Sequence, residues 1–347
     1  MTDKPTMPEM VRIGLHSFSF EQHFLHKPGF DAFAFIDRAV ELGVAGVHIS
    51  MNGQNFRCAG GTDPVRLEAI AEAAGEAGLF VETDTSGTDP DHLAQLARAA
   101  RQIGADKLRT YTRHTGKMAD VVKKTTADLK RAAARVADEG VMLLLENHED
   151  FTGAEVTRIL EAVDHPAVQA LYDFGNSMNV VEEPLAAARA MAPFVRSVHL
   201  KDHVLVEDER GATIVGVANG TGSIDIAAVL SYLLTHAPIE RICVESCYGY
   251  CSRLTRNLGA LPAAKRKHKT FKPVRAPFDP GHIQLDAAGL RAADPEALFN
   301  YEAAATTRGI GHLRDTLRAL DYQPVLNSRG GVYRHGTGGL AFDERHR

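Results

Sequence analysis

Short apolar runs and longer amphipathic stretches follow one another regularly along this chain. The apolar runs have strand length, and several are apolar on both faces, as in parallel strands that are covered on both sides. The longer stretches repeat apolar residues at helical spacing and end at glycines such as Gly43, Gly78 and Gly140. The pattern therefore predicts strands that alternate with helices.

The predicted strands are 11–20, 46–50, 79–85, 107–112, 141–150, 168–176, 195–203 and 241–249. The predicted helices are 30–42, 63–77, 89–103, 118–139, 156–163, 184–191, 223–236 and 295–320. Eight strand–helix units predict an α/β fold of the (β/α)8 TIM barrel type. A doubly wound open sheet is the alternative. It normally has fewer units and a phosphate fingerprint after its first strand, and this sequence shows no such fingerprint.

The C-terminal third departs from this alternation. Residues 1–249 carry the eight predicted strands, but residues 250–293 are rich in basic residues and proline and have no periodicity of their own. We expect them to form an extended segment after strand eight that acts as a lid, a partner-docking segment or a small subdomain. Residues 294–326 are expected to form the closing helix, and the glycine-rich residues 327–347 a flexible tail.

Composition and charge exclude several classes of protein. The net charge is −5, which gives no electrostatic footprint for nucleic acid. The N-terminal residues lack the pattern of a signal peptide, and no apolar run approaches the ~20 residues of a membrane helix. We therefore expect a cytoplasmic protein that binds neither nucleic acid nor membrane. Three of the four cysteines, Cys243, Cys247 and Cys251, have a spacing that fits no zinc or redox motif, so we expect reduced, buried thiols.

Candidate chemistry begins in the stretch 141–150, which reads VMLLLENHED. Because strand side chains alternate faces, Glu146 and His148 point the same way. A buried carboxylate is costly without a partner, and we interpret that partner as a metal ion. Asp173, His199 and Glu245 stand at the ends of the next three strands, where barrel enzymes keep their chemistry. Three carboxylates and one imidazole suit manganese, cobalt, magnesium or zinc.

These motifs resemble the xylose-isomerase-like superfamily of sugar isomerases and epimerases, which also contains endonuclease IV. The matching pieces are Glu146 in LLLENH, Asp173 in YDFGN, His199 in VHLKD, Gly220–Asp225 as GTGSID, and Glu245 in CVES. The resemblance covers about residues 11–249. It implies that the four residues bind one divalent metal, which polarises a substrate carbonyl or hydroxyl. Manganese is the ion that we expect first.

Residues near the candidate ligands in the sequence receive candidate roles in catalysis or in the pocket. His148 is the candidate base for proton abstraction, with a second-sphere or core histidine as the alternative. Lys201 is expected to bind a substrate oxygen, and we disfavour a salt bridge to Asp202 or to a barrel carboxylate. His16, His48, Glu82, Arg109 and Tyr111 could line the pocket. In GTGSID, which resembles a phosphate loop, we expect a tight turn with Ser223 as the N-cap of a helix.

Departures from the epimerase pattern favour a different reaction. The resembled ketose 3-epimerases have a histidine three residues after the aspartate, where this chain has Asn176, and an arginine soon after the strand-seven histidine, where it has none until Arg210. The sequence looks more like the catalytic α subunit of C-glycoside deglycosidases. That resemblance implies a metal-dependent lyase on a keto-sugar or glycoside, a small β subunit and an oligomer. A sugar isomerase or epimerase is the alternative, and the acidic charge argues against a nucleic-acid role.

Overall fold

The computed structural model describes residues 10–53, 56–209, 211–239, 241–256, 261–325 and 331–334. Eight parallel strands form a closed barrel, because the last of them pairs with the first. They are β1 (Met10–His16), β2 (Gly46–Ser50), β3 (Phe80–Asp84), β4 (Ala105–Thr110), β5 (Met142–Glu146), β6 (Val168–Asp173), β7 (Val195–Leu200) and β10 (Arg241–Val244). The predicted (β/α)8 barrel is confirmed.

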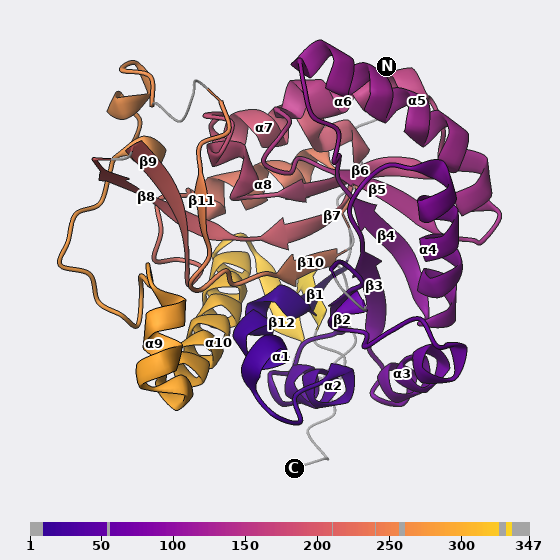
Figure 1. Cartoon of the computed structure of the whole chain (residues 1–347), viewed down its shortest axis with the longest axis horizontal. Coiled ribbons are helices and arrows are strands. Elements are labelled where there is room, and N and C mark those ends of the chain that lie inside the picture. Colours follow the sequence, from indigo (N-terminus) through magenta and orange to yellow (C-terminus); the bar gives the residue numbers. More distant parts are fainter. Residues whose placement is uncertain are drawn as a thin grey trace.

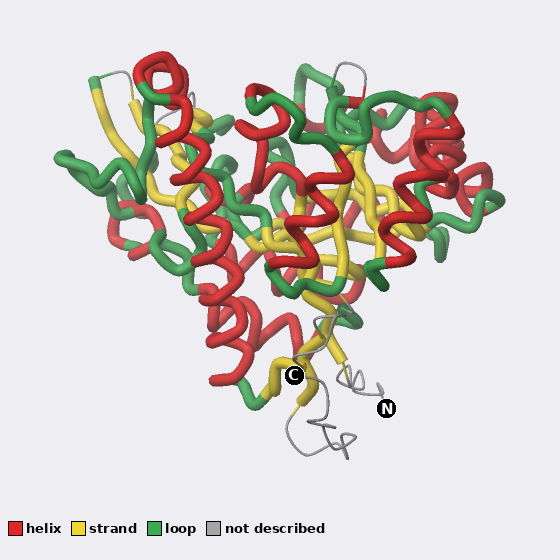
Figure 2. Tube along the Cα trace, turned by 90° about the horizontal axis from the view of Figure 1, so that it is seen from below, coloured by secondary structure: helices red, strands yellow, loops and turns green. Residues whose placement is uncertain are grey.

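Helices surround the barrel strands (Figures 1 and 2). They are α1 (Glu21–His26), α2 (Ala32–Glu41), α3 (Pro64–Glu76), α4 (Pro90–Gln102), α5 (Met118–Ala137), α6 (Gly153–Val163), α7 (Pro184–Met191), α8 (Ile226–His236), α9 (Ala287–Ala293) and α10 (Pro295–Ala319). The Asp-Pro pairs start helices as expected, because Asp63 and Asp89 each accept two backbone N–H groups of the first turn. Among the helices of the described residues, none is long and apolar enough to cross a bilayer.

The first strand is shorter than predicted. It ends at His16, whose Nδ1 accepts the backbone N–H of Phe18 and caps a 3₁₀ turn over Ser17–Phe20. The helix α1 follows directly and was not predicted. Its first turn is held from the far end of the chain, because Glu302 of α10 accepts the backbone N–H groups of Gln22 and His23.

No strand or helix is predicted between the predicted strand 195–203 and the predicted helix 223–236, but the structure has a β-hairpin there. Strands β8 (Asp202–Asp208) and β9 (Gly211–Val217) pair antiparallel, and β11 (Cys251–Arg253) adds to β9. Figure 1 shows this small sheet beside the barrel. Val204, Val215 and Val217 form a separate apolar cluster on it. That alternation of apolar residues is the signal that the sequence interpretation missed.

The segment 250–293 packs along the hairpin. The Val274 backbone N–H donates to Leu205 O at 2.8 Å, and ion pairs tie Arg266 to Glu207 and Lys269 to Asp225. Cys251 in this segment is exposed, which corrects the expectation of a buried thiol, whereas Cys243 and Cys247 are buried as expected.

The closing helix α10 agrees with its predicted bounds within one residue. Two short strands follow it, β12 (Tyr322–Val325) and β13 (Gly331–Arg334), and β13 pairs antiparallel with β1. The rest of the predicted flexible tail, residues 327–330 and 335–347, lies outside the described residues.

The interior of the barrel is unusually polar. At the bottom, the Phe80 ring fills the space beside Gly14 and Gly46, where a Cβ would lie 2.7 and 2.3 Å from it. The Arg241 guanidinium lies 4.4 Å from the centre of this ring and donates to Glu82 at 3.1 Å. Above this layer, the C-terminal ends of the strands carry the candidate site.

Candidate metal centre and cavity

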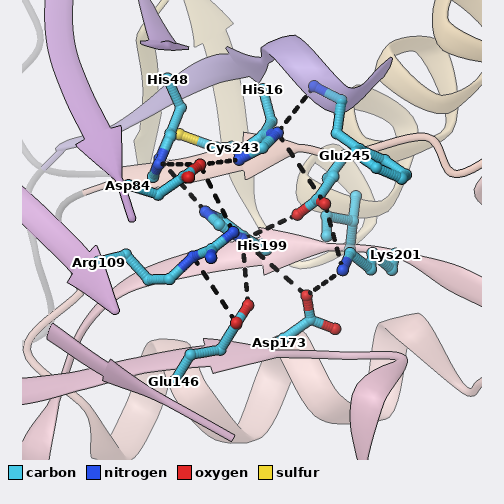
Figure 3. A network of polar contacts seen from close by, with 12 residues as sticks. His16, His48, Asp84, Arg109, Glu146, Asp173, His199, Lys201, Cys243 and Glu245 are labelled. Carbon is cyan, nitrogen blue, oxygen red and sulfur yellow. Dashed lines mark hydrogen bonds and ion pairs between the residues drawn. The ribbon is translucent and has the colours of Figure 1, made fainter. Parts of the chain in front are cut away.

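The four predicted ligands converge at the C-terminal ends of neighbouring strands. His199 Nδ1 lies 2.8 Å from Glu245 Oε2, 3.5 Å from Glu146 Oε1 and 3.9 Å from Asp173 Oδ2. Figure 3 shows His199 in the middle of this network, with the carboxylates directed toward it. Glu146 and Asp173 end β5 and β6, and Glu245 follows β10 directly. The parallel barrel therefore brings together four residues that are up to 99 positions apart in the sequence.

The ligand atoms of this group lack hydrogen-bond partners. Among the described residues, the buried atoms without a partner include both Glu146 oxygens, Asp173 Oδ2, His199 Nδ1 and Glu245 Oε2. Burying such atoms unpaired is costly, and a cation between them would satisfy all four side chains at once. Carboxylate oxygens with one imidazole nitrogen suit a divalent ion. The residues present thus fit the metal that the sequence predicts.

Lys201 lies against two of these carboxylates. Its Nζ is 2.9 Å from Asp173 Oδ2 and 3.2 Å from Glu245 Oε1, although the Asp173 contact is too poorly aligned for a hydrogen bond. The expectation that disfavoured a salt bridge to a barrel carboxylate was therefore wrong. Asp202 is not a partner of Lys201, because its carboxylate accepts backbone N–H groups of Gly220, Gly222 and Ile224. The ammonium supplies one positive charge to a cluster that holds three carboxylates.

The crowding of like charges is visible in the pKa values. Burial raises the pKa of Asp173 to about 6, with a contribution from Glu146 and Glu245 and against the opposing effect of Lys201. Burial would also raise the pKa of Glu146, but the Arg109 guanidinium, with Nε 3.6 Å away, holds it below its usual value. A further cation would lower the electrostatic cost of this cluster.

Two other groups of metal-type side chains lie next to this one. They are His16, His48 and His199, and His48, Glu82 and Cys243. His16 has both nitrogens in use, because Nδ1 accepts from Phe18 N and Nε2 lies 3.0 Å from Asp84 Oδ2. Glu82 accepts from Ser197 at 2.8 Å and from Arg241. His48 Nε2 in these groups has no hydrogen-bond partner, but the engaged side chains of His16 and Glu82 leave neither group with a full set of free ligand atoms.

A cavity of about 390 Å³ opens above the cluster. It is lined by Lys201 and Glu245, whereas Glu146, Asp173 and His199 are fully buried behind it. Aromatic side chains form part of its wall, and they come from three separate elements: Phe18, Tyr111 and Tyr250. The size suits a small ligand, and aromatic walls with convergent polar groups are typical of ligand pockets.

His148 lies in the wall of this cavity, as predicted for a residue that meets substrate. Its ring stacks on Tyr111 with centroids 3.8 Å apart and an interplanar angle of 7°. Among the described residues neither of its ring nitrogens has a hydrogen-bond partner. Burial lowers the pKa of His148 to about 4, so the imidazole is neutral at neutral pH.

The remaining predicted pocket residues divide into two sets. His16, Arg109 and Tyr111 line the cavity, whereas His48 and Glu82 lie deeper in the barrel and do not. Sequence reasoning missed Asp84, which lines the cavity and meets His16, His48 and Arg109. Its signal was the repeat of acidic residues at positions 82 and 84, which places both carboxylates on the inner face of β3.

The GTGSID loop binds a carboxylate of the chain itself. The backbone N–H groups of Gly220, Gly222 and Ile224 donate to the Asp202 side chain at 2.8–3.2 Å. These amides are not available to a phosphate. The N-cap of α8 is Asp225, which accepts from Ala228 N, so the expected cap at Ser223 was wrong.

Comparisons of sequence support the assignment of a family. A family model described as xylose isomerase-like TIM barrel matches residues 36–249. The uncharacterised protein YihM of Escherichia coli (strain K12) is 27% identical over 221 residues, which are 63% of this chain and 67% of YihM. The 3-oxo-isoapionate decarboxylase of Pectobacterium atrosepticum is 28% identical over 173 residues, 48% of this chain. The chain spans 61% of the length of that relative.

Solved structures with the same architecture include sugar epimerases. A D-psicose 3-epimerase with D-fructose has a TM-score of 0.58 and 13% identity, covering 88% of this chain and 99% of its own. The IOLI protein with a bound zinc atom has a TM-score of 0.54 and 12% identity, covering 68% and 89%. At these identities the likeness shows the fold alone. The family model matches more than half of the chain, and the protein therefore belongs to the xylose isomerase-like TIM barrel family.

Proposed function

We propose that the protein is a divalent-metal-dependent lyase that acts on a keto-sugar, as in elimination from a 3-keto-glycoside. One observation carries the proposal: four side chains with unpartnered ligand atoms converge beside a cavity whose wall holds an unpartnered imidazole, His148. Glu146, Asp173, His199 and Glu245 would hold the ion. Manganese is our first choice, with cobalt, zinc and magnesium as alternatives.

A divalent ion held there would supply Lewis-acid polarisation of a carbonyl or hydroxyl oxygen of the substrate. The side chains of the protein would supply the base and a hydrogen-bond donor to a substrate oxygen. His148 takes the proton from the carbon beside the carbonyl, because its ring nitrogens are free of protein partners and Tyr111 fixes the ring plane. Lys201 lines the cavity and donates a hydrogen bond to a substrate oxygen, which stabilises negative charge that develops there.

The proposed elimination balances without another reactant. The C–H electron pair forms the new carbon–carbon double bond, and the proton passes to the imidazole of His148. The bond to the leaving group breaks with its electron pair, and the leaving group takes up a proton. The proton on His148 can return in that second step, so the residue ends the cycle neutral.

Two observations favour a lyase over an epimerase. Asn176 lines the cavity at the position where the resembled ketose 3-epimerases have a histidine, and an amide cannot serve as a proton carrier. One of the sequence relatives is named as a decarboxylase of a 3-oxo acid, and decarboxylation is a lyase reaction. The structural neighbours include sugar epimerases, so a sugar isomerase or epimerase is the second candidate.

The remaining parts of the proposal concern substrate size and partners. The aromatic wall suits the ring of a small carbohydrate or glycoside. The resemblance to a deglycosidase α subunit also suggests a small β subunit and an oligomer, and the segment 250–293 is the surface that we propose for the partner.

An activity assay distinguishes the candidates. Metal-loaded protein is incubated with a 3-keto-glycoside and separately with common ketoses, and aglycone release and new sugar isomers are measured. We expect aglycone release that is lost in His148→Ala, while bound metal is retained. His165→Ala is the matched control, because His165 is also half-buried but precedes β6, at the opposite end of the strand from Asp173 and outside the cavity. A new ketose isomer without aglycone release would favour the epimerase, and full activity in His148→Ala would remove His148 as the base.

The ligand assignment has its own test. Metal content is measured in Glu146→Gln, Glu245→Gln and Glu82→Gln. We expect loss of stoichiometric metal in the first two and retention in the third, because Glu82 is a buried carboxylate that already accepts from Ser197 and Arg241. Loss in Glu82→Gln alone would place the ion in the deeper group with His48 and Cys243.

A further inference from the structure

The two nitrogens of His199 face different surroundings. Nδ1 points to the predicted metal ligands, with Glu245 Oε2 at 2.8 Å. Nε2 points across the barrel, away from the cavity, and lies 3.2 Å from His48 Nδ1. His199 is fully buried and His48 nearly so, so water does not compete for this contact.

His48 continues the contact toward a carboxylate. Its Nε2 lies 3.3 Å from Asp84 Oδ2, within ion-pair distance but not aligned as a hydrogen bond, and this nitrogen has no hydrogen-bond partner among the described residues. Asp84 is itself fixed, because its other oxygen accepts from Ser50 Oγ at 2.7 Å. Figure 3 shows His199, His48 and Asp84 in succession. The three residues come from β7, β2 and β3, which are brought together only inside the closed barrel.

The positions of the protons on His199 and His48 follow from hydrogen-bond chemistry. A neutral imidazole that offers its Nδ1 lone pair to a cation carries its proton on Nε2. In His199 that N–H faces His48 Nδ1, which accepts it. His48 then carries its own proton on Nε2, which faces the Asp84 carboxylate at 3.3 Å. The competing contact of His48 Nδ1 with Glu82 Oε2 is longer, at 3.5 Å.

We infer that His48, anchored by Asp84, is a positioning residue that holds His199 in the tautomer and ring orientation needed to bind a divalent ion through Nδ1. This inference rests on the proposed metal site. Partners behind a metal-binding histidine generally contribute ~10–100-fold to metal affinity. It also explains why two buried polar residues, His48 and Asp84, occupy a barrel interior that is usually apolar.

The test measures metal affinity instead of activity. Co²⁺ binding to the full-length protein is followed by competition with a chromogenic chelator and by the visible absorption of the bound ion. We expect His48→Leu to weaken Co²⁺ binding by ~10–100-fold and to change the absorption spectrum. His48→Asn, whose side-chain oxygen can accept near the position of Nδ1, should restore most of the affinity.

Two further variants separate the role of His48 from a general effect on the barrel interior. Ser197→Ala removes a neighbouring buried hydrogen bond to Glu82 and should bind Co²⁺ like the wild type. Asp84→Asn should weaken binding in the wild-type background but add little to His48→Leu, because residues of one network are non-additive. Equal losses in His48→Leu and Ser197→Ala, or full additivity with Asp84→Asn, would overturn the inference. Wild-type protein that binds no Co²⁺ would overturn the metal site itself, whereas binding that His48→Leu leaves unchanged would overturn only the role of His48.

Discussion

Replacement of Lys201 by methionine tests the charge balance of the predicted metal site. Methionine has a similar length but no charge, so Asp173 and Glu245 lose the ammonium that lies 2.9 and 3.2 Å from them. All three groups are buried, and removal of one partner of a buried ion pair costs ~3–5 kcal/mol. Asp173, whose pKa is already raised to about 6 by burial, can take up a proton and limit the loss. We therefore expect about 3 kcal/mol of destabilisation in the metal-free protein.

The assay is thermal unfolding by circular dichroism, with a chelator and with added Mn²⁺. A loss of about 3 kcal/mol lowers the Tm by about 6 °C, because 1 kcal/mol corresponds to ~2–4 °C in large domains. Mn²⁺ should raise the Tm of Lys201→Met by more than that of the wild type, because the variant no longer places an ammonium beside the bound ion. For comparison, an ion present at 100 times its Kd stabilises a protein by about 2.7 kcal/mol.

The control replaces Lys265, whose partner Glu183 is 3.4 Å away and also about one-third exposed, at 36% and 34%. Exposed pairs contribute about 1 kcal/mol or less, so Lys265→Met should change the Tm little, with or without Mn²⁺. The reasoning is refuted if metal-free Lys201→Met is as stable as the wild type. It is also refuted if Mn²⁺ stabilises that variant less than the wild type.

Other predictions concern the elements that hold the site in place. Gly222→Ala should destabilise the fold by about 2 kcal/mol or more, because its Cβ would lie 2.1 Å from Asp202 Oδ1, whereas Gly75→Ala in an exposed helical position should stabilise it by ~0.5–1 kcal/mol. Urea unfolding of both variants checks this pair, and a stable Gly222→Ala would contradict the role of the Asp202 loop. Glu302→Ala should cost about 3 kcal/mol, because two backbone N–H groups of α1 and the His23 ring lose their acceptor. Faster amide hydrogen exchange confined to α1 would accompany it, and unchanged exchange there would show that Glu302 does not hold this helix.

The barrel, and the convergence of the four candidate ligands at one end of it, could be predicted because both depend on local patterns. Apolar runs, Asp-Pro pairs and glycines mark the bounds of most helices and strands. A parallel barrel brings the C-terminal ends of its strands together independently of the conformation of the loops. The proximity of Glu146, Asp173, His199 and Glu245 therefore follows from their positions at the ends of neighbouring strands, and their role as metal ligands remains a prediction. The hairpin β8–β9 was missed because its polar residues alternate with valines that pack on a small separate cluster and not on the main core.

The interior partners of the site could not be predicted, because they depend on contacts across the barrel. Asp84 and His48 approach His199 through the lumen, and no spacing in the sequence reports which strands face one another there. The salt bridge of Lys201 was misjudged for the same reason. The Lys201 side chain reaches from the end of β7 to Asp173 at the end of β6. The alternation of side chains along one strand does not predict a contact with the neighbouring strand.

The position of a bound ion decides whether the four candidate ligands form a metal site. Crystals of the protein loaded with Mn²⁺ or Co²⁺ are measured at wavelengths on both sides of the absorption edge of the metal, and the anomalous difference map is inspected. We predict one strong peak that contacts Glu146, Asp173, His199 Nδ1 and Glu245. A peak between His48, Glu82 and Cys243, or a fully loaded protein without a peak among the four predicted ligands, would contradict the proposed metal site and the lyase chemistry built on it.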